Sequence, residues 1–85
     1  MRLDKYLKVS RLIKRRTVAN DACDAGRVKV NDKIARASYD VKIGDVIEIA
    51  FGNKNVKAEV LKIVETTKKD EAGDMFRIIT GEAID

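Results

Sequence analysis

The spacing of apolar residues changes once along this chain, at Gly26. Before that glycine, Leu3, Tyr6 and Leu7 follow the i, i+3, i+4 spacing of one helix face. After it, residues 28–30 alternate between apolar and charged side chains, which is the period of a half-buried strand. The change predicts an α+β fold, with two N-terminal helices packed on a small, mostly antiparallel sheet of four to five short strands.

The second helix is bounded by residues that favour helix ends. Thr17 is a candidate N-cap, because its hydroxyl can accept a backbone N–H of the first turn. Gly26 supplies the left-handed conformation in which many helices end. These signals predict a helix from about Thr17 to Ala25, in which Cys23 is a small buried hydrophobe.

The remaining strands follow from turn residues and apolar runs. Asn31 and Asp32 both tolerate positive φ, so they predict a tight hairpin turn.

A chain of 85 residues has room for one domain. We expect residues 65–85 to add a polar loop and a C-terminal strand to that domain. The further strands are predicted at residues 46–51, 56–64 and 75–80.

Charge is distributed unevenly along the chain. Residues 1–16 hold seven cations and one anion, a net charge of +6, whereas residues 17–85 hold eleven cations and thirteen anions, a net charge of −2. Like charges crowded into one short segment repel one another and cost stability. The front of the chain is therefore expected to meet a partner of negative charge.

The densest part of that segment is Arg11, Lys14, Arg15 and Arg16. The arginine fork donates two parallel hydrogen bonds to a phosphate, and the N-terminus of a helix also favours an anion. Placed at the start of the second helix, the cluster predicts a composite phosphate site on folded RNA. A solvated surface that serves only solubility is the alternative, and a membrane surface fits less well because no aromatic residues flank the cations.

The residue types needed for most catalysis are missing. The chain has no histidine and a single cysteine, so neither a zinc site of the usual kind nor a nucleophile with an imidazole base can be built. We therefore expect no enzyme activity, no metal and no cofactor. The single cysteine, and the lack of a signal peptide or an apolar membrane span, predict a cytoplasmic protein without a membrane partner.

Residues 2–32, "RLDKYLKVSRLIKRRTVANDACDAGRVKVND", resemble the S4 RNA-binding domain family. The matching motifs are an opening Arg-Leu-Asp, an Arg-Thr pair, a helix ending in Gly, and Val-x-Val-Asn. "VKIGDVIEI" at residues 41–49 matches the family's closing turn and strand. One departure is Asp32, which stands where the family usually has glycine. The resemblance implies that residues 1–64 form an RNA-binding domain of this type.

The resemblance also implies a function. Some members of the family consist of this domain almost alone and have a similar basic N-terminal segment. The resemblance to them implies binding to the large ribosomal subunit when peptidyl-tRNA obstructs it. It further implies a role in ribosome-associated quality control, in which alanine tails are added to stalled nascent chains. The implied partners are the rRNA of the large subunit, peptidyl-tRNA and other quality-control factors, and we expect the protein to act as a monomer.

The family's RNA contacts lie on the two helices and at the start of the hairpin. Asp4 matches the family's acidic position, where it would orient a neighbouring arginine or an RNA hydroxyl. The RNA-binding residues implied by the resemblance are Arg2, Asp4, Lys5, Lys14, Arg15, Arg16, Arg27 and Lys29.

Three other functions stay open at this point. A DNA-binding helix-turn-helix regulator would read DNA with residues 17–25, although Asp21 and Asp24 would bring the wrong charge to phosphates. A general rRNA-binding assembly factor would use the same cations. A protein adaptor would instead use the acidic back half.

Overall fold

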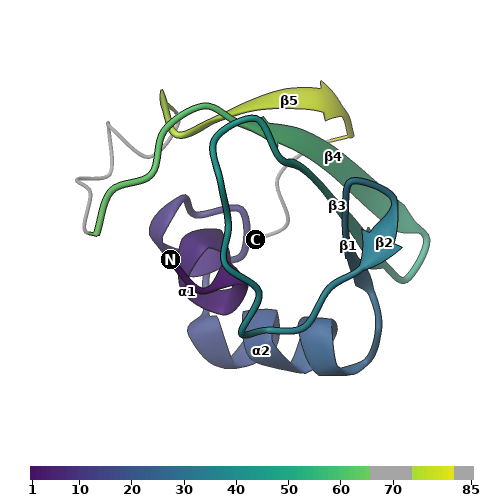
Figure 1. Ribbon diagram of the computed structural model, residues 1–85. Helices are drawn as coiled ribbons and strands as arrows, with labels where there is room; N and C mark the ends of the chain where they lie inside the picture. Colours follow the sequence, from purple (N-terminus) through teal and green to yellow (C-terminus); the bar gives the residue numbers. More distant parts are fainter. Residues whose placement is uncertain (66–73, 82–85) are drawn as a thin grey trace.

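The computed structural model describes residues 1–65 and 74–81, and two short helices lie on one face of a five-stranded sheet (Figure 1). The polar loop predicted within residues 65–85 falls largely outside the described residues. No helix in the described part of the chain is long and apolar enough to cross a membrane. The elements are α1 (Leu3–Val9), α2 (Arg16–Asp24), β1 (Val28–Val30), β2 (Lys33–Ile34), β3 (Val46–Phe51), β4 (Lys54–Val60) and β5 (Phe76–Thr80).

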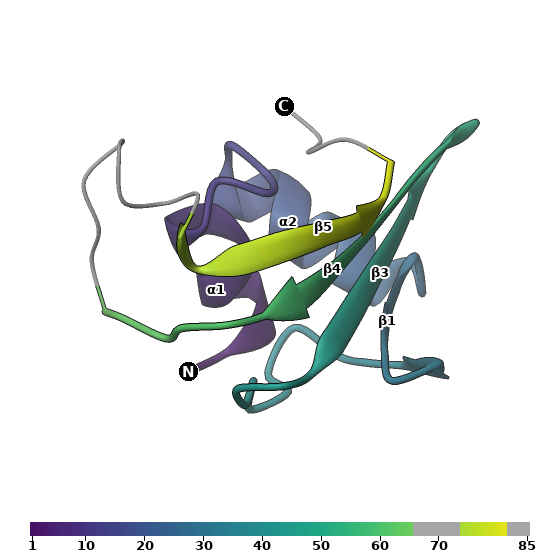
Figure 2. The same ribbon diagram turned by 90° about the horizontal axis from the view of Figure 1, so that it is seen from above.

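The sheet has the strand order β2-β1-β3-β4-β5, and every neighbouring pair is antiparallel. Figure 2 shows β1, β3, β4 and β5 side by side in this order, with both helices on the same face. The predicted α+β fold is confirmed. The strand predicted at residues 56–64 corresponds to β4, and the prediction is wrong at both ends. β4 begins two residues earlier, at Lys54, which pairs with Phe51 of β3, and it ends four residues earlier, at Val60.

The core lies between the helices and the sheet. Leu3, Tyr6 and Leu7 are fully buried, as their spacing predicts. The Tyr6 hydroxyl donates a hydrogen bond of 2.7 Å to the carbonyl oxygen of Met75, which is also fully buried. A helix-face pattern does not reveal this bond, because residue 75, distant in sequence, supplies the buried acceptor. The contact ties α1 to the residue just before β5.

The second helix begins one residue earlier than predicted. Its N-cap is Arg15, whose backbone is extended and whose carbonyl accepts a 3.0 Å bond from the N–H of Ala19. Thr17 lies inside the first turn, so the prediction that it caps the helix is wrong. Gly26 ends the helix as predicted, with φ +73° and bonds from Gly26 and Arg27 back to the carbonyls of Cys23 and Ala22, which form a Schellman motif.

The hairpin between β1 and β2 has the turn that Asn31-Asp32 predicts. Both residues have positive φ, 52° and 69°, which defines a type I′ turn and shows that Asp32 adopts the conformation usual for glycine. The Asn31 side chain donates to Oδ1 of Asp45 at 3.0 Å and accepts a bond from the N–H of Val46 at 3.0 Å. The hairpin is thereby joined to the turn that precedes β3.

Candidate nucleic-acid interface

The loop between the helices holds its cations outward because its apolar residues point inward. Leu12 and Ile13 are fully buried, whereas Arg11, Lys14 and Arg15 are exposed. The buried Ser10 fixes the start of the loop: its hydroxyl donates to the Leu7 carbonyl at 3.2 Å and accepts from the N–H of Leu12 at 3.4 Å. The buried pair Leu12 and Ile13 therefore anchors the loop, and the neighbouring cations are held on one surface.

Arg11 has an unusual backbone conformation, with φ +63°. A residue with a Cβ in this region costs roughly 1–2 kcal/mol relative to the right-handed region. The Arg11 N–H donates to the Lys8 carbonyl at 3.0 Å, and the N–H of Ile13 donates to the Leu7 carbonyl at 3.1 Å. These bonds and the burial of Leu12 and Ile13 offset the cost, and they leave the Arg11 side chain in the solvent.

Asp4 is a buried carboxylate that connects both helices. Its Oδ1 accepts bonds from Nε of Arg2 at 3.1 Å and from the N–H of Lys5 at 2.9 Å. Its Oδ2 accepts bonds from Nε of Arg16 at 3.5 Å and from the amide of Asn20 at 3.3 Å. Only 3% of the Asp4 side chain is exposed, whereas 52% of Arg2 and 49% of Arg16 are exposed.

This network keeps Asp4 ionised. Burial alone would raise the pKa of its carboxyl, but the hydrogen bonds from Arg2, Asn20 and the Lys5 backbone, together with the charge of Arg16, outweigh burial and lower the pKa. Each arginine is held through its Nε atom. The terminal Nη groups of Arg2 and Arg16 can therefore bind a phosphate while Asp4 fixes the direction of each side chain.

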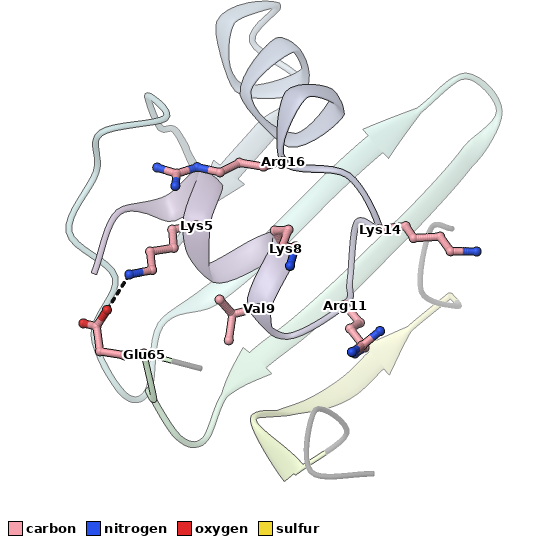
Figure 3. Close-up of a pocket in the computed structure, with 7 residues that line it drawn as sticks. All are labelled: Lys5, Lys8, Val9, Arg11, Lys14, Arg16 and Glu65. Atoms are coloured by element: carbon pink, nitrogen blue, oxygen red, sulfur yellow. Dashed lines mark hydrogen bonds and ion pairs between the residues drawn. The ribbon is translucent and has the colours of Figure 1, made fainter. Parts of the chain in front are cut away.

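A concave surface of about 380 Å³ lies beside this network, and we call it the cationic cavity. Figure 3 shows its side chains arising from α1, the interhelical loop, the start of α2 and, for Glu65, the segment that follows β4. The Lys5 ammonium is paired with the Glu65 carboxylate, sixty residues away in sequence. The cavity is lined by five cations, one apolar residue and one carboxylate: Lys5, Lys8, Arg11, Lys14, Arg16, Val9 and Glu65.

The structure brings together some of the residues implied by the resemblance and separates others. Lys5, Lys14 and Arg16 line the cationic cavity, and Arg2 is joined to Arg16 through Asp4. Arg15 is exposed at the N-cap of α2.

The other two implied residues lie elsewhere. Arg27 follows Gly26 at the far end of α2, on the order of 14 Å along the helix axis from Arg16 at 1.5 Å per residue. Lys29 points away from the helices, because Val28 and Val30 on either side of it are buried. Neither side chain lines the cationic cavity.

Two cations of the cavity were absent from the implied set, namely Lys8 and Arg11. A signal for Lys8 existed in the sequence, because residues three apart on a helix share a face and Lys8 follows Lys5 at that distance. Arg11 belonged to the basic cluster, but its direction depends on the positive φ, which no spacing rule predicts for arginine.

The described residues offer little for catalysis. They contain no group of three or more side chains that could hold a metal ion. Cys23 is buried, as its size and setting predict, and burial followed by the charges of Asp4 and Asp24 raises the pKa of its thiol to about 11. A thiol with that pKa is not a nucleophile near neutral pH.

A rigid cationic cavity on two helices, packed on a small antiparallel sheet, defines a small nucleic-acid-binding domain. A family model described as the S4 domain matches residues 1–47 of the chain.

The chain is 55% identical over 80 residues to the RQC P-site tRNA stabilizing factor of Streptococcus pneumoniae, covering 94% of this chain and 91% of that protein. Identity to the factor of the same name from Bacillus subtilis is 51% over 84 residues, covering 99% and 98%. The trimeric structure of Vibrio cholerae Heat Shock Protein 15 matches with a TM-score of 0.84 and 30% identity, covering 92% of this chain and 80% of that one. The chain therefore belongs to the S4 domain family and, within it, to the RQC P-site tRNA stabilizing factors.

Proposed function

We propose that this chain is a non-catalytic RNA-binding factor of ribosome-associated quality control that stabilises tRNA in the ribosomal P site. It binds the large ribosomal subunit while peptidyl-tRNA obstructs it, and it supports the addition of alanine to the stalled nascent chain. Its partners are the rRNA of the large subunit, peptidyl-tRNA and other quality-control factors. The protein works in the cytoplasm, where these ribosomes are.

The observation that supports this proposal best is the cationic cavity together with Arg2. Five cations line a single concave surface, and Arg2 and Arg16 are held in fixed directions by Asp4. Arginines held in this way suit the fixed phosphate positions of folded RNA, because Arg2 and Arg16 lose little side-chain entropy on binding. The proposed RNA-binding residues are Arg2, Lys5, Lys14, Arg15 and Arg16, extended by Lys8 and Arg11.

A DNA-binding helix-turn-helix regulator is less well supported. Its recognition helix would be α2, on which Asp21 and Asp24 are both exposed. Two carboxylates facing a phosphate backbone would oppose binding. The cations instead gather on α1, the interhelical loop and the first residue of α2.

We also propose that the chain acts as a monomer. Among the described residues, the large exposed apolar side chains are on separate elements and loops: Ile34, Ile43, Leu61 and Ile79. A stable homodimer normally buries a continuous apolar patch. Sedimentation velocity at micromolar concentration should give a single species near 9.5 kDa, and a species three times heavier would contradict the monomer.

The function is tested by gentle capture of the tagged protein from cells with stalled ribosomes. Large subunits that carry peptidyl-tRNA should be recovered with the wild-type protein. If partner proteins are recovered equally well after RNase treatment has removed the rRNA and tRNA, the result would contradict the proposal and favour a protein adaptor. Recovery of precursor subunits without peptidyl-tRNA would instead favour a general rRNA-binding assembly factor.

A further inference from the structure

A second concave surface lies between α2 and residues 34–38, and we call it the Arg36 groove. Its volume is about 530 Å³, and Arg2, Asn20, Arg36 and Ser38 are among the residues that line it. Arg2 is thus common to this groove and to the Asp4 network beside the cationic cavity. The RNA-binding residues implied by the S4 resemblance include neither Arg36 nor Ser38.

The segment that forms one wall of the groove is firmly placed. Ala35 and Ala37 are buried, whereas the side chains of Arg36 and Ser38 are exposed. The N–H of Tyr39 donates to the Arg36 carbonyl at 3.0 Å, which closes a turn over residues 36–39. The N–H of Asp4 donates to the Ala37 carbonyl at 3.2 Å. Because the same backbone carries Arg2, two residues before Asp4, the groove and the Asp4 network form one continuous surface.

The charges in the groove suit an anion. Arg2 and Arg36 both line it, and within the described part of the chain no carboxylate forms an ion pair with Arg36. Two guanidinium groups on one concave surface repel each other unless an anion lies between them. Asp24 is the one carboxylate among the described lining residues, and it belongs to the C-terminal end of α2.

We propose that the Arg36 groove is a second RNA-binding subsite, in which Arg2 and Arg36 hold a phosphate of the same RNA that occupies the cationic cavity. This inference rests on the proposed function. The Ser38 hydroxyl can exchange a hydrogen bond with a ribose 2′-hydroxyl, and the exposed Ile34, which also lines the groove, offers an apolar surface to the sugar or base. RNA then follows a path over Arg16, Arg2 and Arg36.

The test compares Arg36→Ala with Lys54→Ala, which removes an equal charge from an exposed position at the start of β4. Binding of each variant to purified large ribosomal subunits is measured across a series of salt concentrations. Arg36→Ala should weaken binding at least about fivefold and make the salt dependence shallower by roughly 0.7–0.9, the value for one lost phosphate contact. Equal affinities and slopes for the two variants would overturn the subsite.

A third variant, Arg16→Ala, separates this inference from the proposed function. If Arg16→Ala weakens binding and Arg36→Ala does not, the groove is not a subsite and the proposed function stands. If neither variant weakens binding, the proposed function fails as well. Far-UV circular dichroism checks that each variant is folded, which is expected because the side chains of Arg16 and Arg36 are both exposed.

Discussion

Oδ2 of Asp4 accepts a hydrogen bond of 3.5 Å from Nε of Arg16, and Oδ1 of the same carboxylate holds Nε of Arg2. One buried anion therefore fixes two exposed arginines that come from different elements. Asn20 of α2 donates a further bond to the carboxylate. The arrangement makes Asp4 a positioning residue, and it explains why a carboxylate stands in the most cationic part of the chain.

Asp4→Asn should weaken binding to large ribosomal subunits, although it removes a negative charge. Both arginines lose their fixed directions, which costs about 1 kcal/mol for each side chain that RNA must then order, or at least about fivefold in affinity overall. Equilibrium binding at constant salt measures the effect. Asp21→Asn is the matched control, because it removes an exposed carboxylate of α2 and should bind as well as wild type or better. Tighter binding by Asp4→Asn would refute the positioning role.

Stability should fall in acid partly through Asp4. The pKa of this carboxyl is lower in the folded protein than in the unfolded chain, so its contribution is present above the unfolded pKa and is lost as pH falls through the folded pKa. Chemical unfolding between about pH 5 and pH 2 should show a steeper loss for wild type than for Asp4→Asn. Asp45, with its pKa lowered in the same direction, should leave a residual acid dependence in that variant. An identical pH dependence of the free energy of unfolding in wild type and Asp4→Asn would contradict this role of Asp4.

Glu65→Gln should tighten RNA binding. Glu65 is the one carboxylate that lines the cationic cavity among the described residues, and it is paired with Lys5. RNA must displace it from the Lys5 ammonium, so its removal should raise affinity at low salt by at least about twofold. Glu48→Gln, on the outer face of the sheet, is the control with the same change of charge. Equal affinities for the two variants would place the RNA away from Lys5.

Tyr6→Phe should destabilise the fold without altering the cationic cavity. It leaves the buried carbonyl of Met75 without its partner, at a cost of about 1–3 kcal/mol in the free energy of unfolding. Urea unfolding measures the change. Tyr39→Phe should cost less, because the Tyr39 hydroxyl is only partly buried and water can replace it at Asp45. If Tyr39→Phe loses more unfolding free energy than Tyr6→Phe, the bond from Tyr6 to the segment before β5 contributes little to the core.

Local features of the fold could be predicted because they depend on neighbouring residues. The α1 spacing, the Gly26 helix end and the Asn31-Asp32 turn each follow from backbone preferences that act over a few residues. The start of α2 could not be predicted, because Arg15 caps it without a side-chain bond and Thr17 only resembles a cap. Backbone conformation set by tertiary contacts decided that boundary.

The site was predictable in charge but not in geometry. The excess charge of residues 1–16 indicated a polyanion surface, and the S4 resemblance implied Arg2 and Arg16. Neither source could show that Glu65 reaches Lys5, because that contact joins residues sixty positions apart. Arg36 carried no signal either, since its place beside Arg2 depends on the bond between Asp4 and Ala37.

The central claim is that folded RNA docks on the cationic surface around Arg16. Its most direct test is co-sedimentation of Arg16→Ala and Lys54→Ala with large ribosomal subunits carrying peptidyl-tRNA, over a range of salt concentrations. We predict that Arg16→Ala dissociates at much lower salt than wild type, whereas Lys54→Ala sediments like wild type. Equal co-sedimentation of the two variants at every salt concentration would contradict the account.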